Sequence, residues 1–243
     1  MLSERTLDGI RLIADDDAFA RGVLVAFSDR NGGVSKLPYD TLNLAARVGD
    51  DVTDVDDNRA RLAAAAGFAP SALVLTRQVH AADVIEAGPD DSGMIGAADI
   101  LITRVPGRVL GILSADCVPV VLHGGDCVAV VHAGWRGLVR GAIEAGVAAL
   151  GAVERAWVGP SIHACCYEVG PEVVEAFAAH GLPVAAPDRV DPGRAAMVAL
   201  RRAGVEHIEA ITDCTSCDTR YFSYRRDGVT GRQGSFVGLV ERS

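Results

Sequence analysis

The sequence lacks an apolar run long enough to cross a membrane, and it lacks a recognisable export signal. Its longest apolar stretches, such as Cys127 to Trp135, fall well short of the roughly 18 residues that a membrane-spanning helix needs. Residues 1–17 carry several Asp and Glu side chains and no apolar stretch of the kind found in signal peptides. We therefore expect a cytoplasmic protein that does not act in a membrane.

Basic charge is also scarce. The 243 residues include 23 Lys and Arg against 32 Asp and Glu, which gives a formal net charge of -9, and Lys36 is the only lysine. Surfaces that bind nucleic acids or anionic membranes are normally basic. The composition therefore argues against nucleic acid as a partner and favours a small-molecule substrate.

Six cysteines without a secretory signal do not indicate a disulfide framework, because the cytosol keeps thiols reduced. Cys127 begins an apolar stretch and is expected to pack in the core. Cys165 and Cys166 are adjacent and would face opposite ways on an extended chain. Cys214 and Cys217 have CxxC spacing, but no second pair completes a structural zinc site. The roles of these last four cysteines stay open.

The pattern of apolar residues predicts an α/β fold. No GxGxxG motif follows the first strand, so a Rossmann fold is not favoured. Strands are expected at Val23–Phe27, Ala72–Val79, Val84–Glu86, Ile100–Thr103, Val109–Ser114, Val118–Leu122, Val128–His132, Ile208–Thr212 and Ser235–Val240. Helices are expected at Asp54–Ala66, Val139–Leu150, Pro171–His180 and Pro192–Ala203.

Turn and cap residues support these assignments. Gly124 and Gly125 predict a hairpin between two apolar strands. Asp191 is placed to cap the helix that begins at Pro192. No repeat or linker divides the chain, so we expect one domain over residues 1–243, a layered α/β sandwich built around mixed β-sheets.

Three residues near strand ends could together hold a metal ion. His80 ends the segment that begins at Ala72, Cys117 follows an apolar strand, and His132 ends another. Each has a structural alternative, since a lone His or Cys at such a position often only packs. Two imidazoles and one thiolate would leave one tetrahedral position open, which is typical of catalytic zinc. Their spacing is irregular, so the site requires the strands to converge.

The segment His132-Ala133-Gly134-Trp135-Arg136-Gly137 carries the densest chemical signal. Its small residues would let a ligand approach the backbone, and the following helix start and Arg136 could bind an anion. The alternative is a Gly-rich turn with an incidental His and Arg. Tyr221 to Gln233 adds aromatic and Arg side chains that could stack a purine and bind phosphate, or could form a solvated loop.

Several motifs together closely resemble the YfiH family over nearly the whole chain. The most specific are Ala115-Asp116-Cys117-Val118-Pro119 and the HAGWRG segment that begins at His132. The others are Asn43-Leu44, Gln78-Val79-His80, Ala98-Asp99, Gly159-Pro160-Ser161-Ile162, Cys166-Tyr167-Glu168-Val169-Gly170 and Tyr224-Arg225-Arg226-Asp227.

The resemblance implies a single YfiH-like domain with α/β/β/α layers and a metal site at His80, Cys117 and His132. Family members carry two descriptions. One is a copper-containing, laccase-like polyphenol oxidase. The other is a zinc-dependent purine nucleoside phosphorylase that acts on adenosine, inosine and methylthioadenosine and also deaminates adenosine.

The residues favour the second description. Multicopper oxidases bind their trinuclear cluster through HxH pairs, and this sequence contains none. Zinc is therefore the expected metal, with copper as the alternative because copper binds such ligands more tightly. We expect a monomer that binds a nucleoside and phosphate.

Roles follow for the remaining residues. Arg136 and Gly134 are assigned to phosphate, Gln78 and Arg225 to substrate or phosphate, and Asp116 to acid/base catalysis beside the three metal ligands. Two alternatives stay open. Cys117 could act as a nucleophile activated by His132 in a metal-free hydrolase of cell-wall precursors, or the ligand set could be purely structural.

Overall fold

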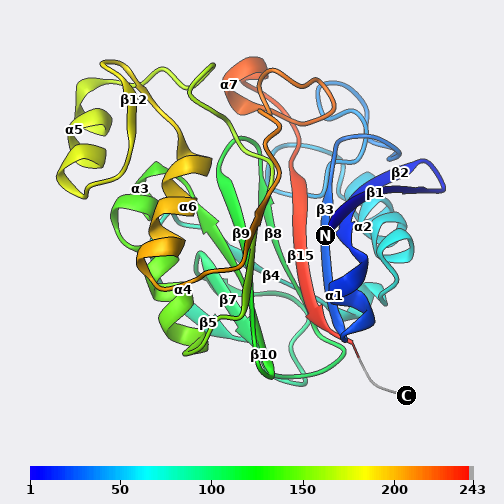
Figure 1. The fold of residues 1–243 in the computed structure, drawn as a ribbon. Helices are drawn as coiled ribbons and strands as arrows, with labels where there is room; N and C mark the ends of the chain where they lie inside the picture. The colour runs from blue at the N-terminus through cyan, green and yellow to red at the C-terminus, as the bar shows by residue number, and fades with distance from the viewer. Residues whose placement is uncertain (241–243) are drawn as a thin grey trace.

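The computed structural model describes residues 1–240, which form two mixed β-sheets with helices on both outer faces (Figure 1). The first sheet has seven strands, in the order β1 (Leu2–Leu7), β2 (Ile10–Asp15), β3 (Val23–Ser28), β15 (Gln233–Leu239), β8 (Val109–Ser114), β4 (Leu73–Arg77) and β6 (Gly93–Ala97). The second has six, in the order β14 (Ile208–Ala210), β11 (Arg155–Val158), β9 (Val118–Gly124), β10 (Cys127–Ala133), β7 (Ile100–Thr103) and β5 (Val84–Glu86).

The remaining elements are short or helical. The helices are α1 (Asp16–Ala20), α2 (Val52–Ala66), the 3-10 turn η1 (Pro70–Ala72), α3 (Trp135–Val139), α4 (Ala142–Leu150), α5 (Pro171–Ala179), α6 (Pro192–Arg202) and α7 (Tyr224–Asp227). A small sheet pairs β12 (Val184–Ala186) with β13 (Arg189–Val190). None of the helices in residues 1–240 is long and apolar enough to cross a membrane.

Three hydrophobic clusters fill the three spaces between four layers. Leu62 of α2 packs with Leu12 and Phe236 on the outer face of the first sheet. Val25, Leu110 and Val130 meet between the two sheets, and further buried residues pack the second sheet against α4 and α6. Figure 1 shows α3 to α6 on one side of the sheets and α2 on the other. The α/β/β/α architecture expected from the sequence is therefore confirmed.

Strand β10 illustrates how the sequence selects these faces. All seven of its residues are buried, because the strand lies inside the second sheet with a layer on each face. Val128 and Val130 belong to the cluster between the sheets, whereas Ala129 and Val131 face the helices. Side chains alternate along a strand, so His132 continues the series of Val128 and Val130 and projects toward the first sheet.

Every strand expected from the sequence is present, with small changes in length. The expected strand Ala72–Val79 is shorter, as β4 ends at Arg77, and the expected strand Ile208–Thr212 ends at Ala210. The hairpin at Gly124 is confirmed, since β9 and β10 pair antiparallel. Asp191 caps α6 by accepting a hydrogen bond from the Arg194 amide at 2.9 Å. The expected domain end at residue 243 lies outside the described residues.

The expected helix Val139–Leu150 needs correction. The structure contains two helices, α3 and α4, separated by Gly141 in the left-handed conformation with φ of 78°. Glycine adopts this conformation without the steric penalty that a Cβ atom brings. Helix α3 begins at Trp135, earlier than the expected helix, with Gly134 as its N-cap.

Candidate metal centre

His80, Cys117 and His132 meet at one end of the space between the two sheets. His80 lies in the connection after β4, Cys117 lies between β8 and β9, and His132 lies in β10. Their ligand atoms all lie within 4.8 Å of one another. The Cys117 Sγ atom is 3.9 Å from His80 Nε2, and the two imidazole centroids are 5.0 Å apart. Strands from both sheets therefore contribute to one cluster.

The buried carboxylate of Asp99 orients both histidines. One oxygen, Oδ1, lies 2.7 Å from His132 Nδ1. The other, Oδ2, accepts the backbone N–H groups of Val79 at 3.0 Å and Ala81 at 2.8 Å, on either side of His80. Because Asp99 occupies Nδ1 of His132, the Nε2 atom is left free to bind a metal.

Both loops that carry ligands adopt backbone conformations that are unfavourable for residues with a Cβ atom. His80 has φ of 60° and Asp116, beside Cys117, has φ of 93°. Such conformations persist where surrounding contacts fix them, and they cluster at functional sites. Here the fixing contacts are Asp99 with the neighbours of His80, and Arg140, whose guanidinium donates to the His80 carbonyl at 2.9 Å.

The electrostatic environment of the cluster favours a thiolate at Cys117, a protonated His132 and an ionised Asp99. Burial disfavours a thiolate at Cys117, but the attraction of His132 and His80 outweighs it and lowers the pKa to about 6. Burial also opposes charge on His132, but Cys117 and Asp99 raise its pKa to about 9. Asp99 is buried as well, yet hydrogen bonds from His132 and the Ala81 and Val79 amides hold its pKa at about 2.

The geometry fits a small tetrahedral metal ion. Zinc binds sulfur at about 2.3 Å and imidazole nitrogen at about 2.0 Å, so S and N ligands lie about 3.5 Å apart. The observed 3.9 Å between Cys117 and His80 is close to that value. A Cβ atom on Gly134 would come within 2.8 Å of His80 Cδ2 and 3.1 Å of Cys117 Sγ, so this glycine keeps the space between the ligands open. The group could hold a metal ion, with exposed His80 on the solvent side.

Asp116 and Gln78 lie beside the cluster but are already engaged with the protein. Asp116 Oδ1 accepts the Thr215 hydroxyl at 2.7 Å, and Oδ2 accepts the Arg225 amide at 2.7 Å. The Gln78 side chain donates to the Leu113 carbonyl at 2.8 Å and accepts the Leu113 amide at 3.0 Å. Asp116 thus fixes the Cys117 loop, and Gln78 fixes the His80 loop against β8. An acid/base role for Asp116 would require one of its contacts to open.

Two arginines lie near the cluster with different partners. Arg136 is exposed, its guanidinium lies 4.3 Å from the Trp135 ring, and no carboxylate in residues 1–240 forms an ion pair with it. The Arg225 guanidinium lies 4.8 Å from the Tyr167 ring and donates to the Glu168 carbonyl at 2.6 Å. Tyr167 contacts Arg225 through its ring, and the charge of Cys117 affects its pKa.

The pKa of the Tyr167 phenol depends on burial and on the charged groups around it. Burial is the main cause that raises its pKa to about 12, followed by the negative charge of Cys117, and Asp116 adds to this. Arg225 and Arg136 act in the opposite direction. The Tyr167 ring therefore lies against the Arg225 guanidinium, and its pKa also responds to the charges of Cys117, Asp116 and Arg136.

Sequence reasoning missed the contributions of Asp99, Arg140, Thr215 and Tyr167. Asp99 had a recognisable signal, since a carboxylate directly before the apolar strand Ile100–Thr103 is an unusual choice for a core. The other three depend on contacts between segments far apart in the sequence.

A second cluster corrects the interpretation of the remaining cysteines. Cys165, Cys166, Cys214 and Cys217 all have their Sγ atoms within 4.8 Å of one another, so this group could also hold a metal ion. The expectation that adjacent cysteines face opposite ways applies to an extended chain. Here Cys165 and Cys166 lie in a turn in which the amides of Cys166 and Tyr167 both donate to the His163 carbonyl.

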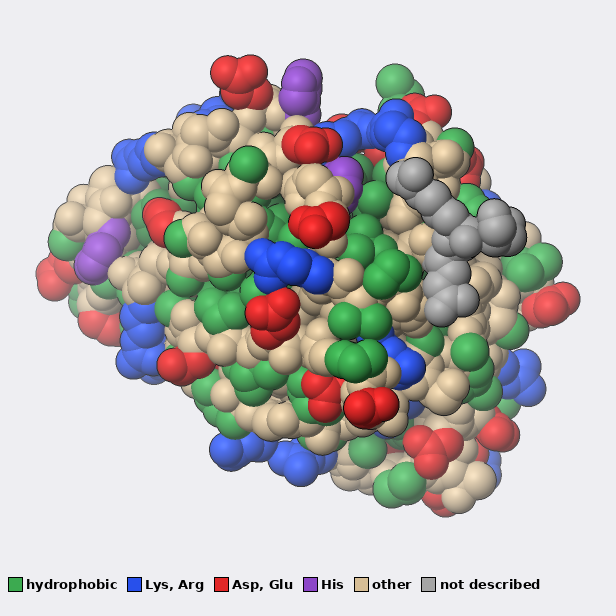
Figure 2. Space-filling view, turned by 90° about the horizontal axis from the view of Figure 1, so that it is seen from below, with side chains coloured by type: hydrophobic (Ala, Val, Ile, Leu, Met, Phe, Trp, Pro, Cys, Tyr) green, Lys and Arg blue, Asp and Glu red, His purple; other side chains and the backbone are tan. Residues whose placement is uncertain are grey.

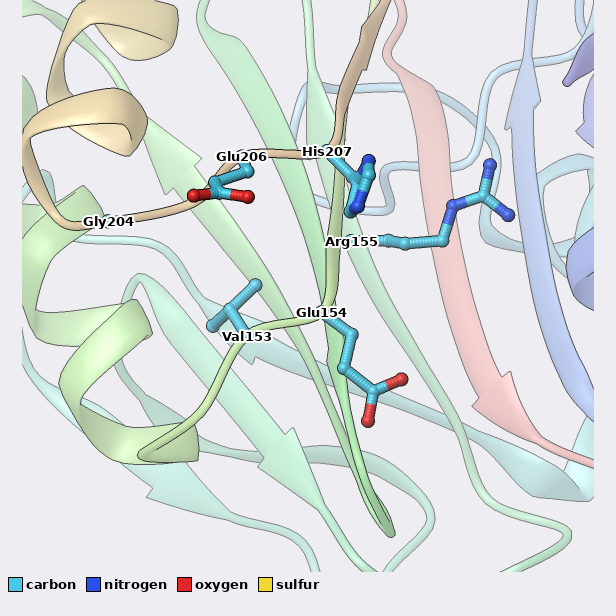
Figure 3. A pocket seen from close by; sticks show the side chains of 6 residues that line it. All are labelled: Val153, Glu154, Arg155, Gly204, Glu206 and His207. Carbon is cyan, nitrogen blue, oxygen red and sulfur yellow. The ribbon is translucent and has the colours of Figure 1, made fainter.

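A surface hollow of about 440 Å³ lies at the other end of the second sheet (Figure 3). It is lined by Val153, Glu154, Arg155, Gly204, Glu206 and His207. Arg155 pairs with His123 near the β9–β10 hairpin, whereas Cys117 precedes the opposite end of β9. The hollow is therefore not part of the candidate centre.

On the face shown in Figure 2, acidic and basic side chains are interspersed.

Comparisons with known proteins agree along nearly the whole chain. A family model described as multi-copper polyphenol oxidoreductase laccase matches residues 24–240. The purine nucleoside phosphorylase YfiH of Escherichia coli (strain K12) is 40% identical over 233 residues, which cover 90% of this chain and 95% of that protein. A purine nucleoside phosphorylase of Pseudomonas aeruginosa is 40% identical over 234 residues, covering 90% and 94%. The crystal structure of YlmD from Geobacillus stearothermophilus matches with a TM-score of 0.89, 32% identity and 98% of each chain covered.

Proposed function

This chain belongs to the YfiH family, whose family model is described as multi-copper polyphenol oxidoreductase laccase, and from that premise we propose that it is a zinc-dependent purine nucleoside phosphorylase. The observation that carries the proposal is the three-ligand cluster of His80, Cys117 and His132, with Arg136, which has no ion-pair partner in residues 1–240, and the partly buried ring of Tyr167 nearby. The proposed substrates are adenosine, inosine and methylthioadenosine together with phosphate, and deamination of adenosine is a proposed side activity.

Phosphorolysis places defined demands on the protein. A phosphate oxygen forms a bond to C1′ of the ribose while the bond from C1′ to the base breaks, and the base leaves with the electron pair and takes up a proton. We assign phosphate binding to Arg136, which has no ion-pair partner in residues 1–240, and to the backbone at Gly134 beside the metal ligands. Arg225 and Tyr167 are proposed to bind the nucleoside, because a stacked Tyr and guanidinium offer flat surfaces to a purine.

His80, Cys117 and His132 would hold the zinc ion. A bound zinc ion with an open coordination position supplies Lewis acidity, which can activate water for attack on a purine ring. Asp99 orients the His132 imidazole and fixes the backbone on either side of His80, and Asp116 holds the Cys117 loop. All three ligands come from one chain, so we propose that the protein acts as a monomer. No disulfide joins the cysteines in residues 1–240, and we propose a cytoplasmic location, where thiols stay reduced.

The test is direct. Purified protein loaded with one equivalent of zinc at the His80 site is incubated with adenosine or inosine and phosphate, and ribose 1-phosphate and free base are quantified. We expect both products in equal amounts and dependence on phosphate. No ribose 1-phosphate from adenosine or inosine, and no methylthioribose 1-phosphate from methylthioadenosine, at full zinc occupancy would overturn the proposal.

Arg136→Ala tests the phosphate assignment. Loss of a charge-assisted hydrogen bond of about 1.5–3 kcal/mol predicts that KM for phosphate rises on the order of tenfold or more, with a smaller change in KM for the nucleoside. Arg201→Ala removes an exposed arginine of α6 and is the matched control. Equal phosphate KM values for the two variants would contradict the assignment.

The lowered pKa of Cys117 also fits an alternative, a metal-free hydrolase in which Cys117 attacks an amide of a cell-wall precursor. Alkylation of Cys117 in zinc-free protein should then abolish precursor hydrolysis, whereas zinc addition should inhibit it. A laccase-like copper oxidase is the remaining alternative from the family description. It predicts phenol oxidation that depends on copper and disappears in His80→Ala.

A further inference from the structure

The cysteine cluster outside the candidate centre joins two loops that leave the second sheet side by side. Strands β11 and β14 pair in parallel, so their carboxyl ends point the same way. The loop after β11 carries Cys165 and Cys166, and the loop after β14 carries Cys214 and Cys217. Backbone contacts hold the loops together, since the Thr215 amide donates to the Ser161 carbonyl at 3.0 Å. Neighbouring parallel strands therefore bring two pairs of cysteines to one place.

The spacing of the four sulfurs is that of a tetrahedral ligand set. Four thiolates at about 2.3 Å from a zinc ion lie about 3.8 Å from one another. Cys217 Sγ is 3.5 Å from Cys165 Sγ and 3.2 Å from Cys166 Sγ, and all four sulfurs lie within 4.8 Å of one another. A disulfide would use only two of them, whereas a single zinc or comparable ion would use all four.

The surroundings suit the charge of such a site. Four thiolates and one zinc ion carry a net charge of −2, which favours N–H donors and cations nearby. The His163 amide donates to Cys214 Sγ at 3.4 Å. Arg189 donates to the Cys165 carbonyl at 2.9 Å, and Arg226 donates to the Thr215 carbonyl at 3.0 Å, so each cysteine loop has a guanidinium bonded to its backbone.

We propose that Cys165, Cys166, Cys214 and Cys217 bind a zinc ion that is separate from the candidate catalytic centre and purely structural. Four protein ligands complete the tetrahedral shell and leave no position for a substrate. The zinc ion fixes Thr215, which lies between two ligands and donates to Asp116, and Tyr167, which follows Cys166 and carries Arg225 on its ring. The second site thereby holds the loop of Cys117 and the proposed nucleoside-binding residues in place.

Metal counting tests the proposal on the full-length protein. Wild type purified without added metal should contain about two zinc ions per chain, and His80→Ala, Cys165→Ser and Cys217→Ser should each contain about one. Cys165 and Cys217 are the exposed members of the cluster, so their substitution disturbs packing least. Cys127→Ala removes a buried cysteine outside both clusters and should keep both ions.

X-ray absorption at the zinc edge on His80→Ala supplies a readout that needs neither activity nor a cysteine variant. We expect a shell of four sulfurs at about 2.3 Å and no nitrogen. Cobalt substituted into the same variant should show strong thiolate-to-metal charge transfer, which Cys217→Ser in the same background abolishes. Loss of this zinc should lower Tm by at least about 5 °C and raise KM for the nucleoside more than it lowers kcat.

Several results would overturn the proposal. One is a wild-type protein with a single zinc ion that disappears in His80→Ala. Another is a native mass two hydrogens lower than expected, which would show a disulfide between two of these cysteines. A mixed nitrogen and sulfur shell in His80→Ala would also contradict it. Each of these outcomes leaves the phosphorylase proposal standing, because that proposal depends on the other cluster.

Discussion

At the scale of single residues, Asp99 has the widest influence on the candidate centre. One carboxylate accepts from His132 and from the amides that flank His80, and the Asp99 carbonyl also accepts the His132 amide at 2.7 Å. An Asn at this position has only one acceptor oxygen, so its NH2 group would face either His132 Nδ1 or the amides of Val79 and Ala81. Partners of metal-bound imidazoles typically contribute 10–100-fold to metal affinity.

We therefore predict that Asp99→Asn weakens zinc binding at the His80 site on the order of 10–100-fold, measured by competition with a chromophoric chelator. Asp83→Asn is the matched control, because Asp83 is exposed in the same connection and its carboxylate has no hydrogen-bond partner in residues 1–240. Equal zinc affinity of the two variants would show that Asp99 does not orient the ligands.

Gly134 offers a test of the space inside the centre. We predict that Gly134→Ala loses about one zinc ion per chain, because its Cβ would meet His80 at 2.8 Å and Cys117 at 3.1 Å. Gly137→Ala, three residues later in α3, meets its nearest atom only at 3.5 Å and should keep the metal. Metal analysis of both variants decides the question, and a metal-replete Gly134→Ala would refute the geometry.

At the scale of elements, sequence patterns predicted the central strand β10 and the short edge strands β5 and β14, but they missed the interior strands β2 and β11 and the strands β1, β6, β12 and β13. Strand β10 is a continuous apolar run, which marks a central strand. Strand β1 is mostly exposed, and β6 contains two glycines in five residues, so neither shows a strong pattern. One signal was available: Asp8-Gly9 between β1 and β2 is a typical hairpin turn, and both residues have positive φ.

The short helix α1 carries a buried carboxylate that makes stability depend on pH. Asp15 caps α1 by accepting the Ala18 amide at 2.9 Å and also accepts Nε1–H of Trp157, a residue of β11, at 2.9 Å. Burial opposes its ionisation, but these hydrogen bonds outweigh burial and lower its pKa below the ordinary 3.8. As the pH falls, Asp15 therefore takes up its proton at a higher pH in the unfolded state than in the folded state. Its contribution to the free energy of unfolding is present above pH ~4 and is lost as the pH falls from there through the folded-state pKa.

We predict that Asp15→Asn lowers the free energy of unfolding by about 1–3 kcal/mol at pH 7 and reduces the loss of stability between pH ~4 and the folded-state pKa. Urea denaturation across that range measures both effects. Asp17→Asn is the control, since its side chain is 69% exposed and should change stability by less than about 0.5 kcal/mol. A pH dependence equal to wild type in Asp15→Asn would contradict the assignment.

At the scale of the whole molecule, residue types in the sequence identified the three candidate metal ligands, but they could not show that these residues lie together in the fold. His80 and Cys117 follow strands of the first sheet, whereas His132 belongs to the second. Their convergence depends on β4 and β8 pairing in parallel, which brings the ends of both strands to one edge, and on the packing of one sheet on the other. The second cysteine cluster depends in the same way on the pairing of β11 with β14. These strand pairings join segments that are far apart in the sequence, and a pattern of neighbouring residues does not indicate which segments pair.

A centre whose ligands come from both sheets should link metal binding to global stability. Zinc at about 100 times its dissociation constant stabilises the folded state by about 2.7 kcal/mol, which raises Tm by about 5–10 °C for a chain of this size. The three hydrophobic clusters contain none of these ligands, so protein without zinc at this site should still unfold in one cooperative transition. Calorimetry of wild type and His80→Ala, each first stripped of zinc and then measured with and without zinc added back, isolates this site as the extra Tm shift of wild type, because zinc at the cysteine cluster shifts both proteins equally. An equal shift in both proteins would mean that zinc stabilises the fold elsewhere, and a non-cooperative melt of His80→Ala would mean that the fold itself requires this ion.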